Sequence, residues 1–252
     1  NTFLDLKYAF DNDRSLGYTY MHNSYRYSYH DPFTYITKLD GTPTFDGTVR
    51  LSNKRYIHVT PADYLGYNGE REQDIHKLRY EDAKNGFKMG VGYSDTYKDG
   101  YSSTGSATSI DWTGAGGRTE YPNKNYNVDI QKTWQIKNNT LLAGAAWMKD
   151  KMRYRSYNLT HWKDWGSTVG NPTMQSGGTI ISTAFFLQDE IALDPRWRLQ
   201  LGMRYDKFDK KDGYSYVGNV RKSYDERRFS AWSPKVAVSY EPQKDMLVFA
   251  SF

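Results

Sequence analysis

Hydrophobic and polar side chains alternate with a period of two along most of the chain, the pattern of strands with one apolar and one polar face. Between residues 197 and 206, one phase holds only Trp, Leu, Met and Tyr, whereas the other holds Arg, Gln, Gly and Asp. Residues 87–94 and 235–240 repeat this pattern, with small or charged residues in the polar phase. The alternation predicts about ten strands, near residues 2–10, 14–30, 73–82, 86–98, 122–136, 140–156, 179–193, 197–210, 229–241 and 245–252.

The connections between these strands are alternately short and long. Short connections rich in turn-forming residues lie at 11–13, 83–86, 137–139, 194–196 and 242–244, and long ones at 31–72, 99–121, 157–178 and 211–228. A soluble sandwich or propeller also alternates, but a sandwich mixes turn lengths at both ends, and no repeat of 40 to 50 residues is present. Outer-membrane barrels have short periplasmic turns and long extracellular loops. The layout predicts an all-β fold, an antiparallel transmembrane β-barrel segment of about ten meandering strands.

Several predicted strands are longer than the nine to eleven or so residues that cross a bilayer. The runs at residues 14–30 and 141–157 would therefore project beyond the membrane. Their outer ends are rich in tyrosine, which favours an outer aromatic girdle over the alternative, the wall of an exposed vestibule. The tyrosines concerned are Tyr25, Tyr27, Tyr29, Tyr154 and Tyr157.

Composition supports the barrel over a soluble domain. Aromatic residues form 16% of the chain, with 23 Tyr, yet the mean hydropathy is −0.84, which is too polar for a thick continuous core. No stretch reaches the roughly 20 apolar residues of a spanning helix. The chain has no Cys, so it has no disulfides or thiolate sites. Its net charge of +5 comes from Lys and Arg interspersed with Asp and Glu, which argues against nucleic-acid binding.

Two segments then carry a family resemblance. Residues 185–206 contain a Gln-Asp strand, a Pro-containing turn and a Gly-x-Arg-Tyr strand, and residues 229–252 contain a strand opened by Ser-Pro and closed by Tyr-x-Pro. In this order they resemble TonB-dependent outer-membrane receptors of Gram-negative-type bacteria. The resemblance implies a 22-stranded barrel and an N-terminal plug, with TonB supplying energy for import of a scarce ligand. The chain shows about ten strands and no plug-like segment. We therefore expect residues 1–252 to be a partial receptor barrel domain from a longer protein, which TonB would contact through the plug region.

A receptor of this kind would bind its ligand with extracellular loops and inward side chains near the outer mouth. Arg offers a planar fork for anionic oxygens, and Tyr or Trp a flat face with one donor. This mixture suits a ferric siderophore, while cobalamin, haem and saccharide remain open. Other expected partners are membrane lipid and lipopolysaccharide, with the receptor a monomer. The candidate ligand-binding residues are Tyr64, Tyr67, Arg71, Trp112, Arg118, Tyr121, Trp162, Trp165, Tyr214, Tyr216, Arg221, Tyr224, Arg227 and Arg228.

An alternative is a complete small ten-stranded barrel, such as an omptin-like protease or an adhesin. A protease would need paired acids and an Asp-His pair that activates water. Here acids lie near histidines in sequence only, as with Asp31 and Asp164, and no Ser-His-Asp order stands out. We therefore expect transport without catalysis and without a cofactor.

Metal ligands are not expected from the sequence. No spacing brings two histidines together on one strand face, so a structural or surface role is expected for His22, His30, His58, His76 and His161. The series Asp206, Asp209, Asp212 and Gly213 is similar to a calcium loop but lacks its closing Glu. We interpret it as a solvated strand end.

Overall fold

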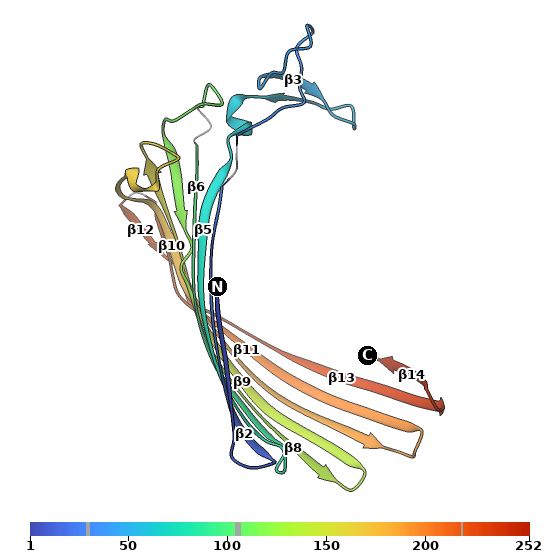
Figure 1. Ribbon diagram of the computed structural model, residues 1–252. Helices are drawn as coiled ribbons and strands as arrows, with labels where there is room; N and C mark the ends of the chain where they lie inside the picture. The colour runs from blue at the N-terminus through green and yellow to red at the C-terminus, as the bar shows by residue number, and fades with distance from the viewer. Residues whose placement is uncertain (29–30, 104–106, 218) are drawn as a thin grey trace.

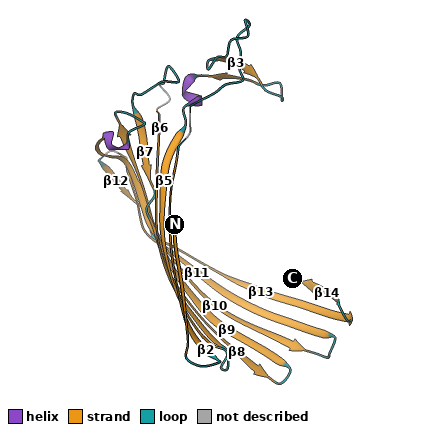
Figure 2. Cartoon of the chain, in the orientation of Figure 1, coloured by secondary structure: helices purple, strands orange, loops and turns teal. Residues whose placement is uncertain are grey.

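The computed structural model describes residues 1–28, 31–103, 107–217 and 219–252, and it shows one strongly curved antiparallel sheet (Figure 1). Two short 3-10 helices and a separate hairpin lie at its long-loop end (Figure 2). The strands are β1 (Thr2–Ala9), β2 (Arg14–Tyr27), β3 (Gly47–Arg50), β4 (Tyr56–Val59), β5 (Tyr67–Asp82), β6 (Phe87–Ser103), β7 (Gly116–Glu120), β8 (Asn123–Ile136), β9 (Asn139–Leu159), β10 (Thr168–Ala192), β11 (Trp197–Val217), β12 (Val220–Ser223), β13 (Arg227–Gln243) and β14 (Met246–Ser251). The helices are η1 (Pro61–Tyr64) and η2 (Trp165–Ser167).

The sheet is a meander, as the short turns predict. Its order is β1-β2-β5-β6, then β7 and β8, then β9-β10-β11-β13-β14, with β12 paired to β11. β7 and β8 lie end to end between β6 and β9 in one continuous register. The break falls at Tyr121 and Pro122, because proline has no N–H to donate to the ladder. Counting β7 and β8 as one line and leaving aside β12 and the separate β3–β4 hairpin, the described residues form ten lines of strand, which confirms the predicted meander.

The strands continue further toward the long-loop end than alternation alone predicts. β5 starts at Tyr67, β10 at Thr168, and β11 reaches Val217, all within segments predicted as loops. Beyond the membrane both faces of a strand meet water, so the ladder continues where the apolar period has ended. The loop assignment was therefore wrong for Tyr67, Arg71, Arg118, Tyr214, Tyr216, Arg221, Arg227 and Arg228, which lie in strands.

Register assigns each strand residue to one of two faces. In the apolar phase, Leu187 pairs with Met203 and Leu201 with Val236, and these side chains are exposed, as expected for contact with lipid. We call this the lipid face, and we call the opposite face, which carries Arg198, Gln200 and Arg204, the lumenal face. Two aromatic rows border the lipid face. The row near the short turns contains Tyr80, Phe87, Trp134, Trp197 and Tyr240, and the row near the long loops contains Tyr20, Tyr93, Tyr126, Trp147 and Tyr205.

The predicted girdle of strand-end tyrosines was wrong for three of its members. Tyr25, Tyr27 and Tyr154 lie in the lumenal phase, one residue out of step with Tyr20 and Trp147. Tyr157 is in the lipid-face phase but beyond the outer aromatic row. Tyr29 and His30 lie outside the described residues. The vestibule interpretation therefore applies to Tyr25, Tyr27 and Tyr154.

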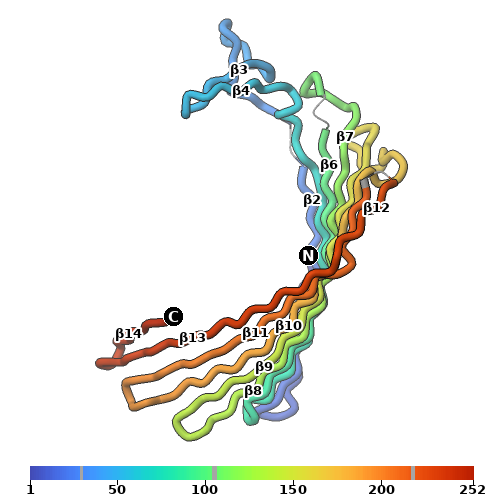
Figure 3. The backbone as a smooth tube through the Cα atoms, turned by 180° about the vertical axis from the view of Figure 1, so that it is seen from behind, coloured from blue at the N-terminus to red at the C-terminus, as the bar shows by residue number. Residues whose placement is uncertain are grey.

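Little of the described chain is buried. The buried apolar residues of the described chain are Ala107, Leu159, Trp162 and Ala184, and all of them except Ala184 belong to the long-loop end. None of the helices in the described part of the chain is long and apolar enough to cross a membrane. The β3–β4 hairpin stands over the concave side of the sheet in both views (Figures 1 and 3). The sheet is thus a wall rather than a core, and ordered packing between connections is concentrated at the long-loop end.

Candidate functional site

A groove of about 800 Å³ lies at the long-loop end of the sheet, between β9, β10, β11, β12 and the start of β13. Its floor includes the lumenal-phase residues Met152, Gly178, Ile180 and Lys210, which pair across the strands as Met152 with Gly178 and Ile180 with Lys210. Pockets for small molecules commonly measure about 300–1,000 Å³. The groove is therefore large enough for a small ligand and is placed where the lumenal face nears its outer mouth.

Glycine creates the groove. The register of β10 and β11 shifts between Gly177 and Thr179, so the two strands are locally out of step. A Cβ on Gly177 would lie 2.8 Å from the carbonyl oxygen of Met152 and 3.0 Å from Cε1 of Tyr214. The missing side chains thus let Tyr214 approach the strand and leave a hollow beside it.

The lining combines aromatic rings with positive charge. Four tyrosines line it, and Tyr121 contacts Tyr154 with ring centroids 5.2 Å apart. Five cationic residues border it against a single carboxylate, Asp225. Lys210, Lys222 and Arg227 are in the lumenal phase, whereas Arg153 and Lys211 pair with Gly177 and Thr179 in the lipid-face phase. Lys222 Nζ lies 5.3 Å from the ring centroid of Tyr224, which Ser215 also contacts through a 3.1 Å hydroxyl–hydroxyl hydrogen bond. The lining tyrosines are Tyr121, Tyr154, Tyr214 and Tyr224, and the cations are Arg153, Lys210, Lys211, Lys222 and Arg227.

Four of the predicted ligand-binding residues meet in this groove: Tyr121, Tyr214, Tyr224 and Arg227. Sequence reasoning missed Arg153, Lys210, Lys211 and Lys222 as lining residues and assigned Tyr154 to a girdle. Lys210 shares its phase with the polar residues of β11, which was a usable signal. The bulge that brings Lys211 into the lining has no equivalent signal in the alternation.

Arg227 and Arg228 lie on opposite faces of β13. Arg227 pairs with Lys210 in the lumenal phase, whereas Arg228 pairs with Asp209 in the lipid-face phase. Arg228 Nε donates to Asp209 Oδ1 at 2.5 Å, and this hydrogen bond lowers the pKa of Asp209. Only Arg227 of the two is therefore placed to contact a ligand in the groove.

A second cluster surrounds Arg118 on the lipid-face phase, well beyond the outer aromatic row. Arg118 Nε donates to Asp99 Oδ2 at 2.7 Å, and Nη2 lies 2.9 Å from Glu120 Oε1. The guanidinium also lies 4.9 Å from the ring centroid of Trp165. Burial raises the pKa of Asp99, and the ion pair with Arg118 opposes this shift. Burial also raises the pKa of Tyr97, whose hydroxyl accepts from Arg118 at 3.0 Å.

The tryptophans of two long loops close over this cluster. Trp162 is buried, and its Nε1 donates to the carbonyl oxygen of Trp112 at 2.6 Å. Gly116 has no room for a side chain, because a Cβ there would overlap Trp162. The structure therefore brings Trp112, Arg118, Trp162 and Trp165 together in loop packing, away from the groove.

The other predicted residues are dispersed. Tyr64 ends η1 and packs edge-on against Phe45 within the first long loop. Tyr67 and Arg71 lie in the lumenal phase of β5, where Tyr67 stacks on Tyr27 at 6.0 Å. Tyr216 and Arg221 face each other across β11 and β12, beyond the groove.

Comparisons place this architecture among known proteins. The family model described as TonB dependent receptor-like, beta-barrel matches residues 2–252. Among solved structures, the unliganded ferric citrate transporter FecA has a TM-score of 0.63 at 14% identity, covering 99% of this chain and 34% of FecA. The ferric yersiniabactin uptake receptor FyuA from Yersinia pestis has a TM-score of 0.65 at 11% identity, with 99% and 36% covered. The copper transporter OprC has 0.63 at 13% identity, with 99% and 36% covered.

A search of curated proteins finds no match to the chain. The chain spans about a third of the length of the solved structures it matches. These likenesses show the barrel fold, and the family model, which covers nearly every residue, shows the relationship. It favours the receptor over the omptin-like protease and the adhesin that a ten-strand count also allows. The chain belongs to the TonB-dependent receptor-like β-barrel family of the Gram-negative outer membrane.

Proposed function

We propose that this chain forms part of the wall of an outer-membrane importer and that the groove binds a ferric siderophore, an anionic and partly aromatic iron chelate. The observation that carries this proposal is the lining of the groove, in which four tyrosines accompany five cations and one carboxylate. Guanidinium and ammonium groups bind the anionic oxygens of such a chelate, and tyrosine rings stack on its aromatic groups. The family, together with its similarity to the ferric citrate transporter FecA and the ferric yersiniabactin uptake receptor FyuA, supports the same class of cargo.

Uptake would be coupled to TonB through a plug domain of the full receptor, and the lipid face would contact membrane lipid and lipopolysaccharide around a monomeric barrel of 22 strands. Catalysis has no role in this proposal. Cobalamin and saccharides present mostly uncharged groups, so they would bind less favourably to the five cations of the groove. Haem would need an axial ligand, and since none of the described histidines lines the groove, a tyrosine or Met152 would have to supply it.

A matched pair of neighbouring residues tests the assignment. Arg227→Ala in the full receptor should weaken binding and uptake of an anionic ferric chelate about tenfold or more, because a hydrogen bond to a charged group contributes about 1.5–3 kcal/mol. Arg228→Ala removes the same charge from the lipid face and should leave uptake within about twofold. Radiolabelled iron carried by ferric citrate, a ferric hydroxamate and a ferric catecholate provides the measurement. Equal effects of the two variants, or full uptake of all three chelates by Arg227→Ala, would contradict the proposal.

A further inference from the structure

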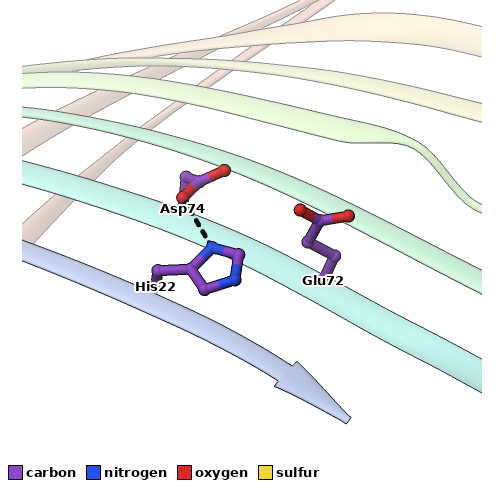
Figure 4. Close-up of side chains that lie close together, drawn as sticks. All are labelled: His22, Glu72 and Asp74. Atoms are coloured by element: carbon purple, nitrogen blue, oxygen red, sulfur yellow. Dashed lines mark hydrogen bonds and ion pairs between the residues drawn. The ribbon is translucent and has the colours of Figure 1, made fainter. Parts of the chain in front are cut away.

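Three potential metal ligands meet on the lipid face of β2 and β5, immediately beyond the outer aromatic row. His22 on β2 is directly opposite Asp74 on β5, and Glu72 is two residues further along β5 in the same phase. One row toward the membrane, Tyr20 pairs with His76. The three side chains project from the sheet on the same side, as Figure 4 shows. They therefore lie outside the apolar band and on the face opposite to the groove.

The geometry of the three groups is that of a nearly formed coordination site. One ligand atom from each of His22, Glu72 and Asp74 lies within 4.8 Å of the other two. Ligand atoms of a tetrahedral zinc site are about 3.4 Å apart, given bonds of roughly 2.1 Å. Glu72 is exposed, and a change of its rotamer is the adjustment that would bring it closer to the other two groups. The backbone positions are fixed by two continuous ladders, so the site needs no rearrangement of the sheet.

Supporting contacts hold two of the ligands in place. His22 Nδ1 lies 3.0 Å from Asp74 Oδ1 (Figure 4), and the Tyr20 hydroxyl donates to the same oxygen at 3.0 Å. An ion held by both residues replaces the His22–Asp74 contact and binds Nδ1 of His22 and a carboxylate oxygen of Asp74, which the Tyr20 hydroxyl keeps in position. Outer hydrogen bonds of this kind orient metal-binding side chains in known sites.

Charge around the three residues also favours a cation. Asp95 on β6 is opposite Asp74, but it is paired with Lys124 at 2.9 Å, and Glu70 is paired with Arg26 at 2.9 Å. Among the described residues, Glu72 has no hydrogen-bonding or ionic partner. In this row of carboxylates Glu72 thus has no cationic partner within the described part of the chain, and Asp74 contacts only Tyr20 and His22 there.

We propose that His22, Glu72 and Asp74 bind a divalent transition-metal ion, with Zn²⁺ as the reference ion, on the outward face of the barrel. One imidazole and two carboxylates are ligands that zinc accepts, with water completing the coordination. Affinity should follow the usual order for such ligands, with Cu²⁺ above Zn²⁺ and both above Mn²⁺. The site faces away from the groove, so it is independent of the proposed cargo.

Zinc binding to the chelator-treated full receptor in detergent tests the proposal by titration calorimetry. Wild type should bind at least one equivalent of Zn²⁺, and His22→Ala should remove one equivalent or weaken it by tenfold or more. Glu72→Gln, which keeps the size of the side chain, should weaken the same equivalent. Retention of the heat-modifiable band on gels verifies that each variant is folded.

The matched control is His58→Ala, which removes an exposed histidine that lies 3.4 Å from Asp46 in the β3–β4 hairpin. This variant should retain every equivalent. Wild type without a zinc equivalent, unchanged stoichiometry and affinity in both site variants, or an equal loss in His58→Ala would overturn the assignment.

Discussion

The ion cluster around Arg118 gives the sharpest test of how the long-loop end is held together. Arg118 is 13% exposed at its side chain and contacts Asp99, which is 4% exposed, and Glu120, which is 10% exposed. Arg118→Ala removes the cation between two buried carboxylates. Glu120 keeps a longer contact with Arg155 at 3.4 Å, whereas Asp99 loses its only ion pair among the described residues.

The expected cost is about 3–5 kcal/mol, which is typical when one partner of a buried ion pair is removed. The loss should be local, because β7 contacts its neighbours through only five residue pairs on each side, whereas β9 and β10 share a long ladder. A local loss of this size raises backbone hydrogen exchange by about two orders of magnitude or more. We therefore expect faster exchange in residues 114–120 and 160–168, with the membrane-spanning strands unchanged.

Hydrogen exchange by mass spectrometry on the full receptor measures this effect. Arg26→Ala is the matched control, because Arg26 is 83% exposed and pairs with Glu70 in the same way at 2.9 Å. A surface pair contributes at most about 1 kcal/mol, so exchange near Arg26 should change less than about fivefold. Comparable effects of the two variants, or an exchange rate near β7 within a few-fold of wild type, would refute the reasoning.

The pH dependence adds a second readout on the same variant. Burial already raises the pKa of Asp99, and loss of Arg118 removes the group that opposes this shift. A carboxyl whose pKa is higher in the folded state binds more protons when folded, so lowering the pH stabilises the fold. The loss of local stability caused by Arg118→Ala should therefore be smaller at about pH 5.5 than at pH 8. An equal loss of stability at both pH values would show that the unpaired Asp99 carboxylate is not its cause.

Three further predictions concern neighbouring contacts. Gly116→Ala should cost about 1–3 kcal/mol locally through overlap with Trp162, seen as faster proteolysis of residues 160–168. Trp162→Phe removes the hydrogen bond to the carbonyl oxygen of Trp112 and should cost about 1 kcal/mol in the same proteolysis assay. Arg228 lowers the pKa of Asp209, so the contribution of this pair should persist above about pH 4 and be lost as the pH falls further. An acid titration of Arg228→Ala should show a weaker dependence, because, of the described residues, only Lys207 then lowers the pKa of Asp209.

The membrane part of the fold was predictable from side-chain alternation. Trp197, Leu201 and Met203 occupy the lipid face, as their period indicates, because the bilayer demands apolar groups on one phase only. The same rule fails at Tyr67 and Tyr214, since a strand in water carries no such demand. The predicted strands therefore stopped short of the long-loop end of the sheet.

The candidate site was predictable in composition but not in geometry. Tyr121, Tyr214, Tyr224 and Arg227 were in the predicted set and meet in the groove. Arg118 and Arg227 are both arginines, but Arg118 is surrounded by buried acids and loop tryptophans. These groups come together only through the register across β6, β7 and β9. Sequence chemistry alone does not distinguish the two arginines.

The opposite placement of Arg227 and Arg228 has a consequence for how this wall can vary. Each strand is in effect two interleaved sequences, one that faces the bilayer and one that faces the lumen. Under the proposed function, substitutions confined to every second position of β9, β10 and β11 would change ligand preference without affecting membrane insertion. Insertion of a single residue in β13 would exchange the two sequences at once and present Arg227 to the outside. Diversification of the wall is therefore open to substitution in these strands, whereas a change of strand length needs a register shift such as the one between Gly177 and Thr179.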